Sequence, residues 1–431
     1  MAKNTNINLR NSVIYQVFPR QHSNKSNFLG VIEDLDRIKD LGCDILYLLP
    51  IHPIGQKNKK GSLGCPYSIY NYKEVNKDLG TLDDFKKLIE ETHNRNMKIM
   101  IDVVYNHTSR DSYLLKNHPE WFYRNENNEF ANRVGDWWDV TDLDYTKEGL
   151  KEELISTLVY WASLGVDGFR CDVAPLVPLD FWIEARKELI KVNKDIILFA
   201  ESVEPGFVKY IRDCGFEAAS DAELYEAFDI EYDYDIIKSY RNYLRNNGPL
   251  NDWLNSLINQ ETMYPKNFIK AHGLENHDNE RSAYYIKDSV KIRNLNALTY
   301  FLKGTTFIYA GQEALDTKQE SLFDVDLIDW SNLGKYDLVN LMKKCYEIKK
   351  DPLFANGIYN IILHDEEIAH LTYESSNEEL VCICNLGNLD KEILCEMPDG
   401  EYINIFDDTN ISIVNGYIKL SSNPIVIKYN K

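Results

Sequence analysis

The sequence predicts an α/β protein built on a closed (β/α)8 barrel, the TIM-barrel architecture, with a small inserted domain and a C-terminal antiparallel β-sandwich. Apolar runs without polar alternation, typical of parallel strands buried on both faces, alternate with helical periodicity through the first three quarters of the chain. A polar, aromatic and turn-rich stretch follows the third run. Beyond about residue 356, short alternating segments separated by turns replace the helical period and indicate the sandwich.

Eight apolar runs are the predicted barrel strands. They begin near residues 13, 45, 99, 166, 196, 216, 268 and 306, and the run at 216–220 is the weakest of them. Between them, residues 31–41 have helical spacing and end at Gly42, where a helix C-cap is expected. Thr81 and Asp84 form a predicted capping box before another helix. A doubly wound open sheet is the alternative arrangement of the same units.

These patterns divide the chain into four segments. The first part of the barrel is expected at 1–106, the inserted domain at 107–145, the second part of the barrel at 146–352 and the sandwich at 353–431. The insert is too long for an ordinary loop between a strand and a helix. A further stretch, 217–237, has eight acidic residues without Lys or Arg and is predicted to be a solvated surface, with a cation site as the alternative.

Composition narrows the classes of partner. The 431 residues carry 48 Lys and Arg against 68 Asp and Glu, a net charge of −20 that would repel nucleic acid. No stretch approaches the roughly 18 uncharged apolar residues of a membrane-spanning helix. The first six residues lead into no apolar leader, so we expect a cytoplasmic protein. The eight cysteines lack Cys-x-x-Cys spacing, so we expect them to be reduced thiols. The sequence indicates no oligomeric state.

Charged side chains follow the predicted strands at their carboxyl ends, where barrel enzymes have their active sites. Four carboxylates occupy these positions: Asp102, Asp172, Glu201 and Asp278. Such a cluster is costly to bury unless it is paired or has a function. Two carboxyl groups that flank one bond are what glycosidic cleavage requires. Other acid–base or phosphoryl chemistry is an alternative, but the sequence has no phosphate-binding loop, nucleophile elbow or dinucleotide fingerprint.

Four segments resemble, in order, the signature regions of the α-amylase family, glycoside hydrolase family 13. They are residues 102–107 (DVVYNH), 168–174 (GFRCDVA), 199–202 (FAES) and 275–279 (ENHDN). Residues 13–18, 66–72 and 308–313 are also similar to stretches of this family. The resemblance covers most of the chain and implies a hydrolase of α-1,4-linked glucans or malto-oligosaccharides.

The resemblance also implies roles for single residues. Asp172 is expected to attack the anomeric carbon, Glu201 to protonate the leaving oxygen and then activate water, and Asp278 to bind ring hydroxyls. Substrate contacts are implied for Tyr67, His107 and His277, and Asp102 is implied to hold Arg170. Because Arg170 lies two residues before Asp172 on the same strand face, we expect it to lower the pKa of Asp172.

Departures from the family pattern concern metal and substrate. Asn106 matches a position that often binds calcium, whereas Ala174-Pro175 replaces the Lys-His of many α-amylases. We therefore expect no required cofactor, with calcium at Asn106 as an open alternative. Val173 resembles members that cut α-1,6 links. Alternatives within the family are an α-glucosidase, an oligo-1,6-glucosidase or a transglycosidase, and outside catalysis an inactive sugar-binding or partner subunit.

Overall fold

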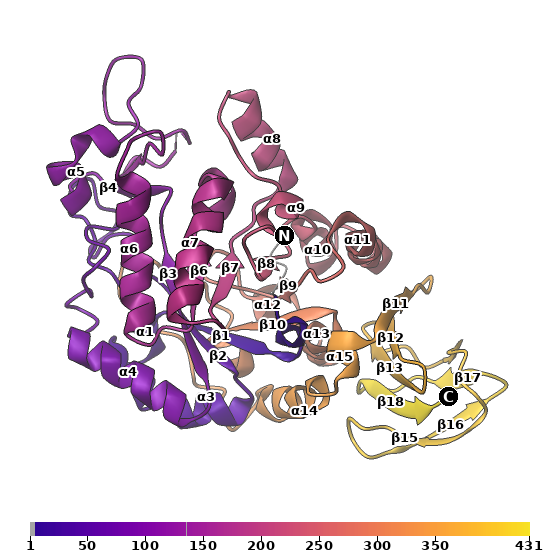
Figure 1. Cartoon of the computed structure of the whole chain (residues 1–431). Helices are drawn as coiled ribbons and strands as arrows, with labels where there is room; N and C mark the ends of the chain where they lie inside the picture. The colour runs from indigo at the N-terminus through magenta and orange to yellow at the C-terminus, as the bar shows by residue number, and fades with distance from the viewer. Residues whose placement is uncertain (1–4, 135) are drawn as a thin grey trace.

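Eight parallel strands form a closed barrel at the centre of the computed structural model, which describes residues 5–134 and 136–431 (Figure 1). β1 pairs with both β2 and β10, so the sheet closes on itself and the open-sheet alternative is wrong. In barrel order the strands are β1 (Val13–Val17), β10 (Gly304–Tyr309), β9 (Lys270–His272), β8 (Ile230–Tyr232), β7 (Ile197–Ala200), β6 (Gly168–Cys171), β3 (Lys98–Val103) and β2 (Ile45–Leu48).

Successive side chains of each strand point alternately into the barrel and outward to the helices, so the barrel strands contribute to two hydrophobic cores. Ile14, Tyr47, Met100 and Phe199 belong to the cluster that fills the barrel interior, whereas their strand neighbours pack outward against the helices. The interior leaves no room for a side chain at Gly168, where a Cβ would lie 2.9 Å from the backbone oxygen of Ile197. A glycine is therefore required one layer below the polar residues of the site.

Helices of two or more turns surround the barrel. They are α3 (Leu35–Leu41), α4 (Leu82–Asn94), α6 (Leu150–Ser163), α7 (Leu179–Val192), α8 (Pro205–Asp213), α10 (Ile237–Leu244), α11 (Leu250–Met263), α13 (Ser289–Phe301) and α14 (Val339–Lys349). Gly42 ends α3 with a φ of 102°, in the left-handed region that the predicted C-cap requires. The predicted capping box at the start of α4 is also present, between Thr81 and Asp84.

Shorter elements complete the barrel and build the insert. Around the barrel they are η1 (Ile7–Asn11), α1 (Pro19–His22), α2 (Phe28–Ile32), η3 (Ala174–Leu176), α9 (Asp221–Leu224), α12 (Ser282–Tyr285), η4 (Gln312–Ala314) and α15 (Leu353–Asn356). Between β3 and α6 the insert contains β4 (His107–Ser109), α5 (Tyr113–Asn117), η2 (Pro119–Trp121) and β5 (Val140–Asp142), and β4 pairs antiparallel with β5.

The C-terminal region is a sandwich of two antiparallel sheets, which confirms the predicted fold class together with the barrel. One sheet has the order β11 (Ile358–Ile362), β12 (Ile368–Glu374), β13 (Glu378–Asn385), β18 (Ile425–Asn430), and the other β14 (Glu392–Leu394), β17 (Tyr417–Lys419), β16 (Asn410–Val414), β15 (Gly400–Ile403). The sandwich lies beside α13 and α15 in Figure 1. The Tyr373 hydroxyl donates to the backbone oxygen of Phe301 across this junction.

Two expectations about the acidic stretch are wrong. Residues 216–220 form an irregular loop, and the sixth barrel strand is β8 instead. The stretch is also partly buried, because Asp221, Glu231 and Asp235 surround the ammonium group of Lys270 at 2.5, 3.2 and 3.3 Å. Lys270 pairs with Glu231 across the two adjacent strands. The compensating cation lies outside the acidic stretch, so local composition alone suggested a solvated surface.

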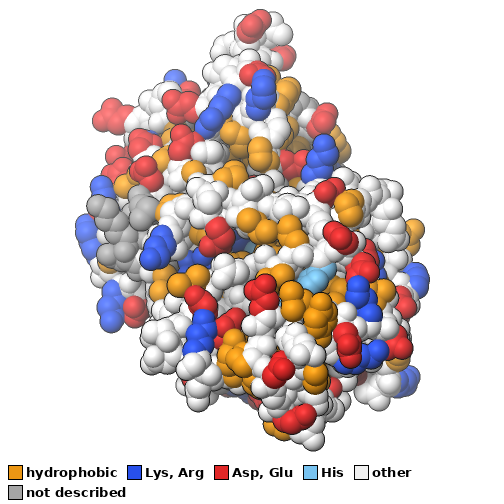
Figure 2. Space-filling view, turned by 90° about the vertical axis from the view of Figure 1, so that its right-hand side faces the viewer, with side chains coloured by type: hydrophobic (Ala, Val, Ile, Leu, Met, Phe, Trp, Pro, Cys, Tyr) orange, Lys and Arg blue, Asp and Glu red, His pale blue; other side chains and the backbone are white. Residues whose placement is uncertain are grey.

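The molecular surface mixes charges of both signs. Acidic and basic side chains are interspersed with hydrophobic ones on the face drawn in Figure 2. In the part of the chain that the structure describes, no helix has the length and apolar character needed to cross a membrane.

Candidate active site

Polar side chains of adjacent strands form one layer at the carboxyl end of the barrel. Asp102 on β3 is in register with Arg170 on β6, and Arg170 with Phe199 on β7. Asp172 and Glu201 lie two residues beyond Arg170 and Phe199, so they share the inward face with them. The alternation of the strands thus brings Asp102, Asp172 and Glu201, which are separated by 29 to 99 positions in the sequence, to one end of the barrel.

Arg170 is the centre of this layer. Its Nη1 lies 2.9 Å from Oδ1 of Asp102 and 3.0 Å from Oδ1 of Asp172, and its Nη2 lies 3.0 Å from Oε1 of Glu201. The Arg170 side chain is 1% exposed, and those of Asp172 and Glu201 are 10% and 11% exposed. One buried guanidinium therefore holds three carboxylates, two of which reach the surface of the site.

Burial is the main cause of the pKa shifts of Asp102 and Asp172. Burial and the negative charge of Glu201 raise the pKa of Asp172 well above its usual range, although Arg170 lowers it. Arg170 thus lowers the pKa of Asp172 as expected, but burial and Glu201 outweigh this contribution and the net shift is upward. Burial also raises the pKa of Asp102 to about 6 against the effect of Arg170. Because one guanidinium cannot compensate three close carboxylates, the site retains protons that exposed acids would lose.

The backbone at Val173 turns sharply between Asp172 and the short helix η3. Val173 has φ 36° and ψ 47°, a left-handed conformation that is uncommon for a β-branched residue. This turn directs the Val173 N–H to Oε2 of Glu201 at 2.7 Å. Both oxygens of Glu201 thus face donors, since Oε1 contacts Arg170. The strained residue after Asp172 is tied directly to the neighbouring carboxylate.

Tyr67 and His277 form a stacked pair beside the carboxylates. Their ring centroids are 5.5 Å apart at 14°, and the Tyr67 hydroxyl lies 2.6 Å from Nε2 of His277 and 2.9 Å from Oδ2 of Asp102. Burial lowers the pKa of His277 to about 3, so its imidazole is neutral. Asp278 contacts the same Nε2 at 3.1 Å, and its side chain is 46% exposed. Asp278 therefore lies at the open mouth of the site.

His107 and Asn106 connect the site to the insert. The Asn106 amide nitrogen lies 3.1 Å from Nδ1 of His107, whose ring is 5.3 Å from that of Trp137. The amide oxygen of Asn106 accepts a hydrogen bond from Nη2 of Arg133 at 3.4 Å. A hard cation requires free oxygen ligands, so a side chain that already donates to this oxygen does not fit a calcium ion beside it. Among the residues that the structure describes, no group of three or more His, Cys, Asp or Glu is arranged to hold a metal.

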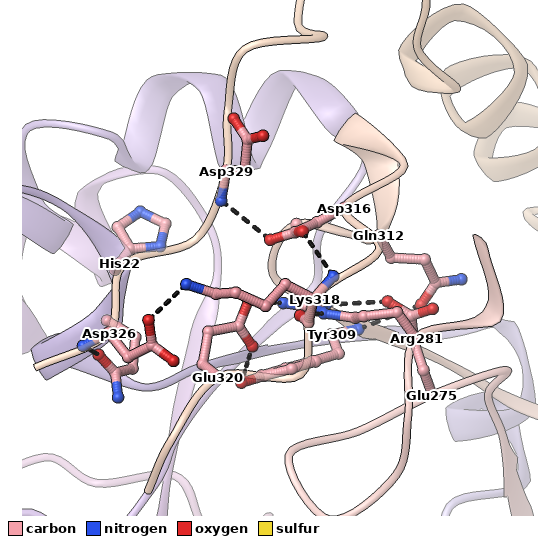
Figure 3. A network of polar contacts seen from close by, with 12 residues as sticks. His22, Glu275, Arg281, Tyr309, Gln312, Asp316, Lys318, Glu320, Asp326 and Asp329 are labelled. Atoms are coloured by element: carbon pink, nitrogen blue, oxygen red, sulfur yellow. Dashed lines mark hydrogen bonds and ion pairs between the residues drawn. The ribbon is translucent and has the colours of Figure 1, made fainter. Parts of the chain in front are cut away.

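A buried network supports the loop that carries His277 and Asp278. Figure 3 shows Arg281 between Glu275, three residues before Asp278, and Glu320 in the loop after η4. Arg281 donates to Glu275 at 2.8 Å and to Glu320 at 2.7 Å, and all three side chains are at most 1% exposed. The loop of β9 is thus fixed to the loop that follows β10.

All nine predicted site residues lie in or directly beside this layer, but sequence reasoning missed several of their partners. The Tyr47 hydroxyl donates to Oδ2 of Asp102 at 2.5 Å, and Nε2 of Gln16 lies 2.9 Å from Nδ1 of His277. Polar atoms inside otherwise apolar strands were the available signal for both. Arg133 lies in a turn-rich segment without periodicity, and nothing in the sequence distinguished it.

Comparison with family models places most of the chain in one family. Residues 16–138 and 115–353 match the model of the alpha amylase catalytic domain, and residues 360–427 match that of the bacterial alpha amylase C-terminal domain.

Solved structures resemble the whole chain. An alpha-amylase from Lactobacillus plantarum is 42% identical with a TM-score of 0.95, covering 98% of this chain and 100% of that one. A maltogenic alpha-amylase from Thermotoga neapolitana is 32% identical with a TM-score of 0.87 and the same coverage. Among curated proteins, an alpha-1,4-glucan:maltose-1-phosphate maltosyltransferase from Picrophilus torridus is 31% identical over 44% of this chain. The matched region covers only 32% of the length of that relative. The chain therefore belongs to the α-amylase family, glycoside hydrolase family 13.

Proposed function

We propose that the protein is a retaining glycoside hydrolase that cleaves α-1,4-glucosidic bonds in maltodextrins and in glucans of the starch or glycogen type. The observation that carries the proposal is the position of Arg170, which contacts Asp172 and Glu201 at 3.0 Å each. Two carboxyl groups on one guanidinium are close enough to flank a single glycosidic bond, as a retaining mechanism requires at roughly 5 Å. Family membership supports an α-glucan as the substrate.

The reaction proceeds in two displacements. An oxygen of Asp172 attacks the anomeric carbon while Glu201 gives its proton to the glycosidic oxygen, so that the carbon–oxygen bond breaks and the leaving sugar departs as an alcohol. Glu201, now a carboxylate, takes a proton from water, and the water oxygen displaces Asp172 from the anomeric carbon. Two inversions at that carbon retain the α configuration.

The proton for the first step belongs to the carboxylate pair. Because the pKa of Asp172 is raised beside Glu201, the pair keeps one proton to higher pH than an isolated acid would. When a glucan is bound, the glycosidic oxygen accepts a hydrogen bond from Glu201, and the positive charge that develops at the anomeric carbon favours an ionised Asp172. Substrate binding therefore favours the arrangement in which Glu201 holds the proton that the leaving oxygen needs.

Other side chains of the layer hold the sugar. Asp278, at the exposed mouth, accepts hydrogen bonds from ring hydroxyls, and the neutral imidazoles of His107 and His277 bind hydroxyls without adding charge. The Tyr67 ring offers an apolar face to a pyranose. Asp102 keeps Arg170 in place and touches no substrate atom in this scheme.

The assignment is tested with Asp172→Asn and Glu201→Gln. Each is expected to lower turnover of maltoheptaose by about 10²-fold to 10⁴-fold or more while the melting temperature changes little, because each keeps the side-chain shape. Asp195→Asn, an exposed carboxylate far from the site, is the matched control and should retain full activity. NMR of the first product should show the α-anomer, and a β-anomer would contradict the two-displacement scheme.

A substrate panel separates the members of the family. Maltoheptaose, isomaltose, sucrose and pullulan distinguish α-1,4 hydrolysis from α-glucosidase or oligo-1,6-glucosidase activity, and products longer than the substrate would indicate a transglycosidase. Activity on none of them would favour an inactive binding or partner subunit. The three assembled carboxylates support catalysis.

We also propose a cytoplasmic location. All eight cysteines lie in the described part of the chain and are free thiols, and six of them are buried. A protein that keeps this many unpaired cysteines suits a reducing compartment. Detection of the protein in the cytosolic fraction of its native cells tests this proposal, and recovery from the medium would contradict it.

A further inference from the structure

The junction between the insert and the barrel is held by one cationic side chain. Arg133, in the insert, donates from Nε to Oδ2 of Asp142 at 2.9 Å and from Nη2 to the backbone oxygen of Leu143 at 3.1 Å. The same Nη2 reaches Oδ1 of Asn106, three residues after the end of β3, at 3.4 Å. The guanidinium therefore joins β5 of the insert to the segment by which the chain leaves barrel strand β3.

The three acceptors are the kinds of ligand that a hard cation uses. An amide oxygen, a carboxylate and a backbone carbonyl converge on one point, as in protein sites for Ca²⁺. Asn106 and Asp142 are 1% exposed, and the Leu143 N–H donates to the Asn106 backbone oxygen at 3.0 Å, so the acceptors are fixed with respect to one another. Buried oxygens that face one another, one of them a carboxylate, are costly unless a donor or a cation lies between them.

Charge balance favours the guanidinium over a metal. Asp142 supplies the single negative charge of the acceptor set, and Arg133 supplies the single positive charge. A divalent ion added to this set would face one carboxylate and one guanidinium, which leaves an uncompensated excess of positive charge. Arg133 is thus an alternative to a metal ion here and cannot be its neighbour.

We propose that the Arg133 guanidinium takes the place of a bound metal cation at this junction, so that the insert is held on the barrel without a metal. The Asn106 amide links this contact to the active site, because its nitrogen lies 3.1 Å from His107. A groove of about 910 Å³ is lined by Arg133 and by Leu143, one of its acceptors, so solvent reaches the guanidinium from this side.

The proposal is tested by removing the guanidinium and supplying Ca²⁺. Arg133→Ala should lower the melting temperature by roughly 3–5 °C, because it leaves the buried Asp142 carboxylate unpaired. Millimolar CaCl₂ should then restore roughly 1–2 °C, with NaCl of equal ionic strength as the control for screening. The wild-type melting temperature should respond neither to CaCl₂ nor to chelator treatment.

Arg110→Ala is the matched control variant. Arg110 donates to the backbone oxygens of Trp138 and Phe130 in the same insert, so its loss should destabilise without creating a response to Ca²⁺. If Arg133→Ala does not fold, Arg133→Gln, which removes the charge but keeps a donor, provides the same comparison. Arg133→Lys retains a cation and should stay insensitive to Ca²⁺. A wild type stabilised by Ca²⁺, or an Arg133 variant without a Ca²⁺ response beyond that of Arg110→Ala, would overturn the proposal.

Discussion

Asp172 and Glu201 share one guanidinium, and burial together with the charge of Glu201 raises the pKa of Asp172. The sequence predicted both carboxylates because each follows an apolar strand at its carboxyl end. It did not predict the direction of the pKa shift, because that depends on burial and on the distance between two groups 29 residues apart. The left-handed turn at Val173, which brings its N–H to Glu201, also has no local sequence signal.

The coupling between the two carboxylates gives a testable pH dependence. A 5-fluoro-α-glucosyl fluoride carries its own leaving group, so its covalent capture requires ionised Asp172 but no proton from Glu201. In the wild type the capture rate should rise with pH through the raised pKa of Asp172. In Glu201→Gln the negative charge beside Asp172 is gone, so the midpoint of the pH dependence of the capture rate should move to lower pH.

Mass spectrometry of the labelled chain measures this capture rate. Glu204→Gln is the matched control, because Glu204 lies in the same loop, is 54% exposed and pairs with Arg241 at 3.6 Å. Its midpoint should equal that of the wild type. An unshifted midpoint in Glu201→Gln would mean that Glu201 does not set the pKa of Asp172.

At the scale of elements, the loops after β9 and β10 are joined by buried charges. Glu320 is buried and accepts hydrogen bonds from Arg281 and from the Tyr309 hydroxyl. Burial, helped by contact with Asp316, raises the pKa of Glu320 to about 7 against the lowering effect of Arg281. Figure 3 shows these groups together with Lys318, whose N–H donates to Asp316.

The raised pKa of Glu320 predicts a loss of stability with rising pH. The carboxyl group of Glu320 binds its proton more tightly in the folded protein than in the unfolded chain. The free energy of unfolding should therefore fall between about pH 4.5 and pH 7 and then level off. The expected contribution is at most roughly 3 kcal/mol. Glu320→Gln, which resembles the protonated form, should flatten this part of the profile.

Chemical unfolding at a series of pH values measures the free energy of unfolding of the wild type and of Glu320→Gln, and the difference between their pH profiles is the quantity of interest. Asp102 and Asp172 also have raised pKa values and contribute the same slope to both proteins, so the difference isolates Glu320. Glu366→Gln, an exposed carboxylate in the sandwich, should leave the wild-type profile unchanged. Parallel profiles for the wild type and Glu320→Gln would contradict the assignment.

At the scale of the whole molecule, the alternation of apolar runs and helical periods predicted the barrel and the sandwich. The eight strands close because β1 pairs with β2 and β10. Only the sixth strand was misplaced, since β8 has three residues and an acidic one at its centre. Glu231 fits a buried strand because Lys270 neutralises it from the adjacent strand. Long-range charge pairing of this kind is invisible to a local reading of the sequence.

Lys349 offers a test of the interface between the barrel and the sandwich. It is completely buried on α14, where it donates to the backbone oxygen of Leu302 at 3.0 Å and its ammonium lies 5.1 Å from the Phe354 ring centre. Burial lowers its pKa well below the usual range. Lys349→Met should therefore stabilise the protein at pH 7 by about 1 kcal/mol or more, because the cost of burying or neutralising the ammonium disappears.

The gain should shrink at pH 10, since an unfolded lysine then also begins to lose its proton. Thermal melting at both pH values measures it. Lys344→Met, on the same helix but partly exposed, is the control and should change the melting temperature little. A gain of equal size at both pH values would show that packing, and not the charge, accounts for the effect.

The pairing of Glu231 with Lys270 also bears on the order in which a ribosome delivers the chain. Asp221, Glu231 and Asp235 emerge 35 or more positions before Lys270, the lysine that balances them, and β10 emerges later still to meet β1. A nascent chain that ends before residue 270 has three carboxylates and no ammonium among them. Closure of the sheet is consequently a late event in synthesis, after most of the polypeptide has left the exit tunnel.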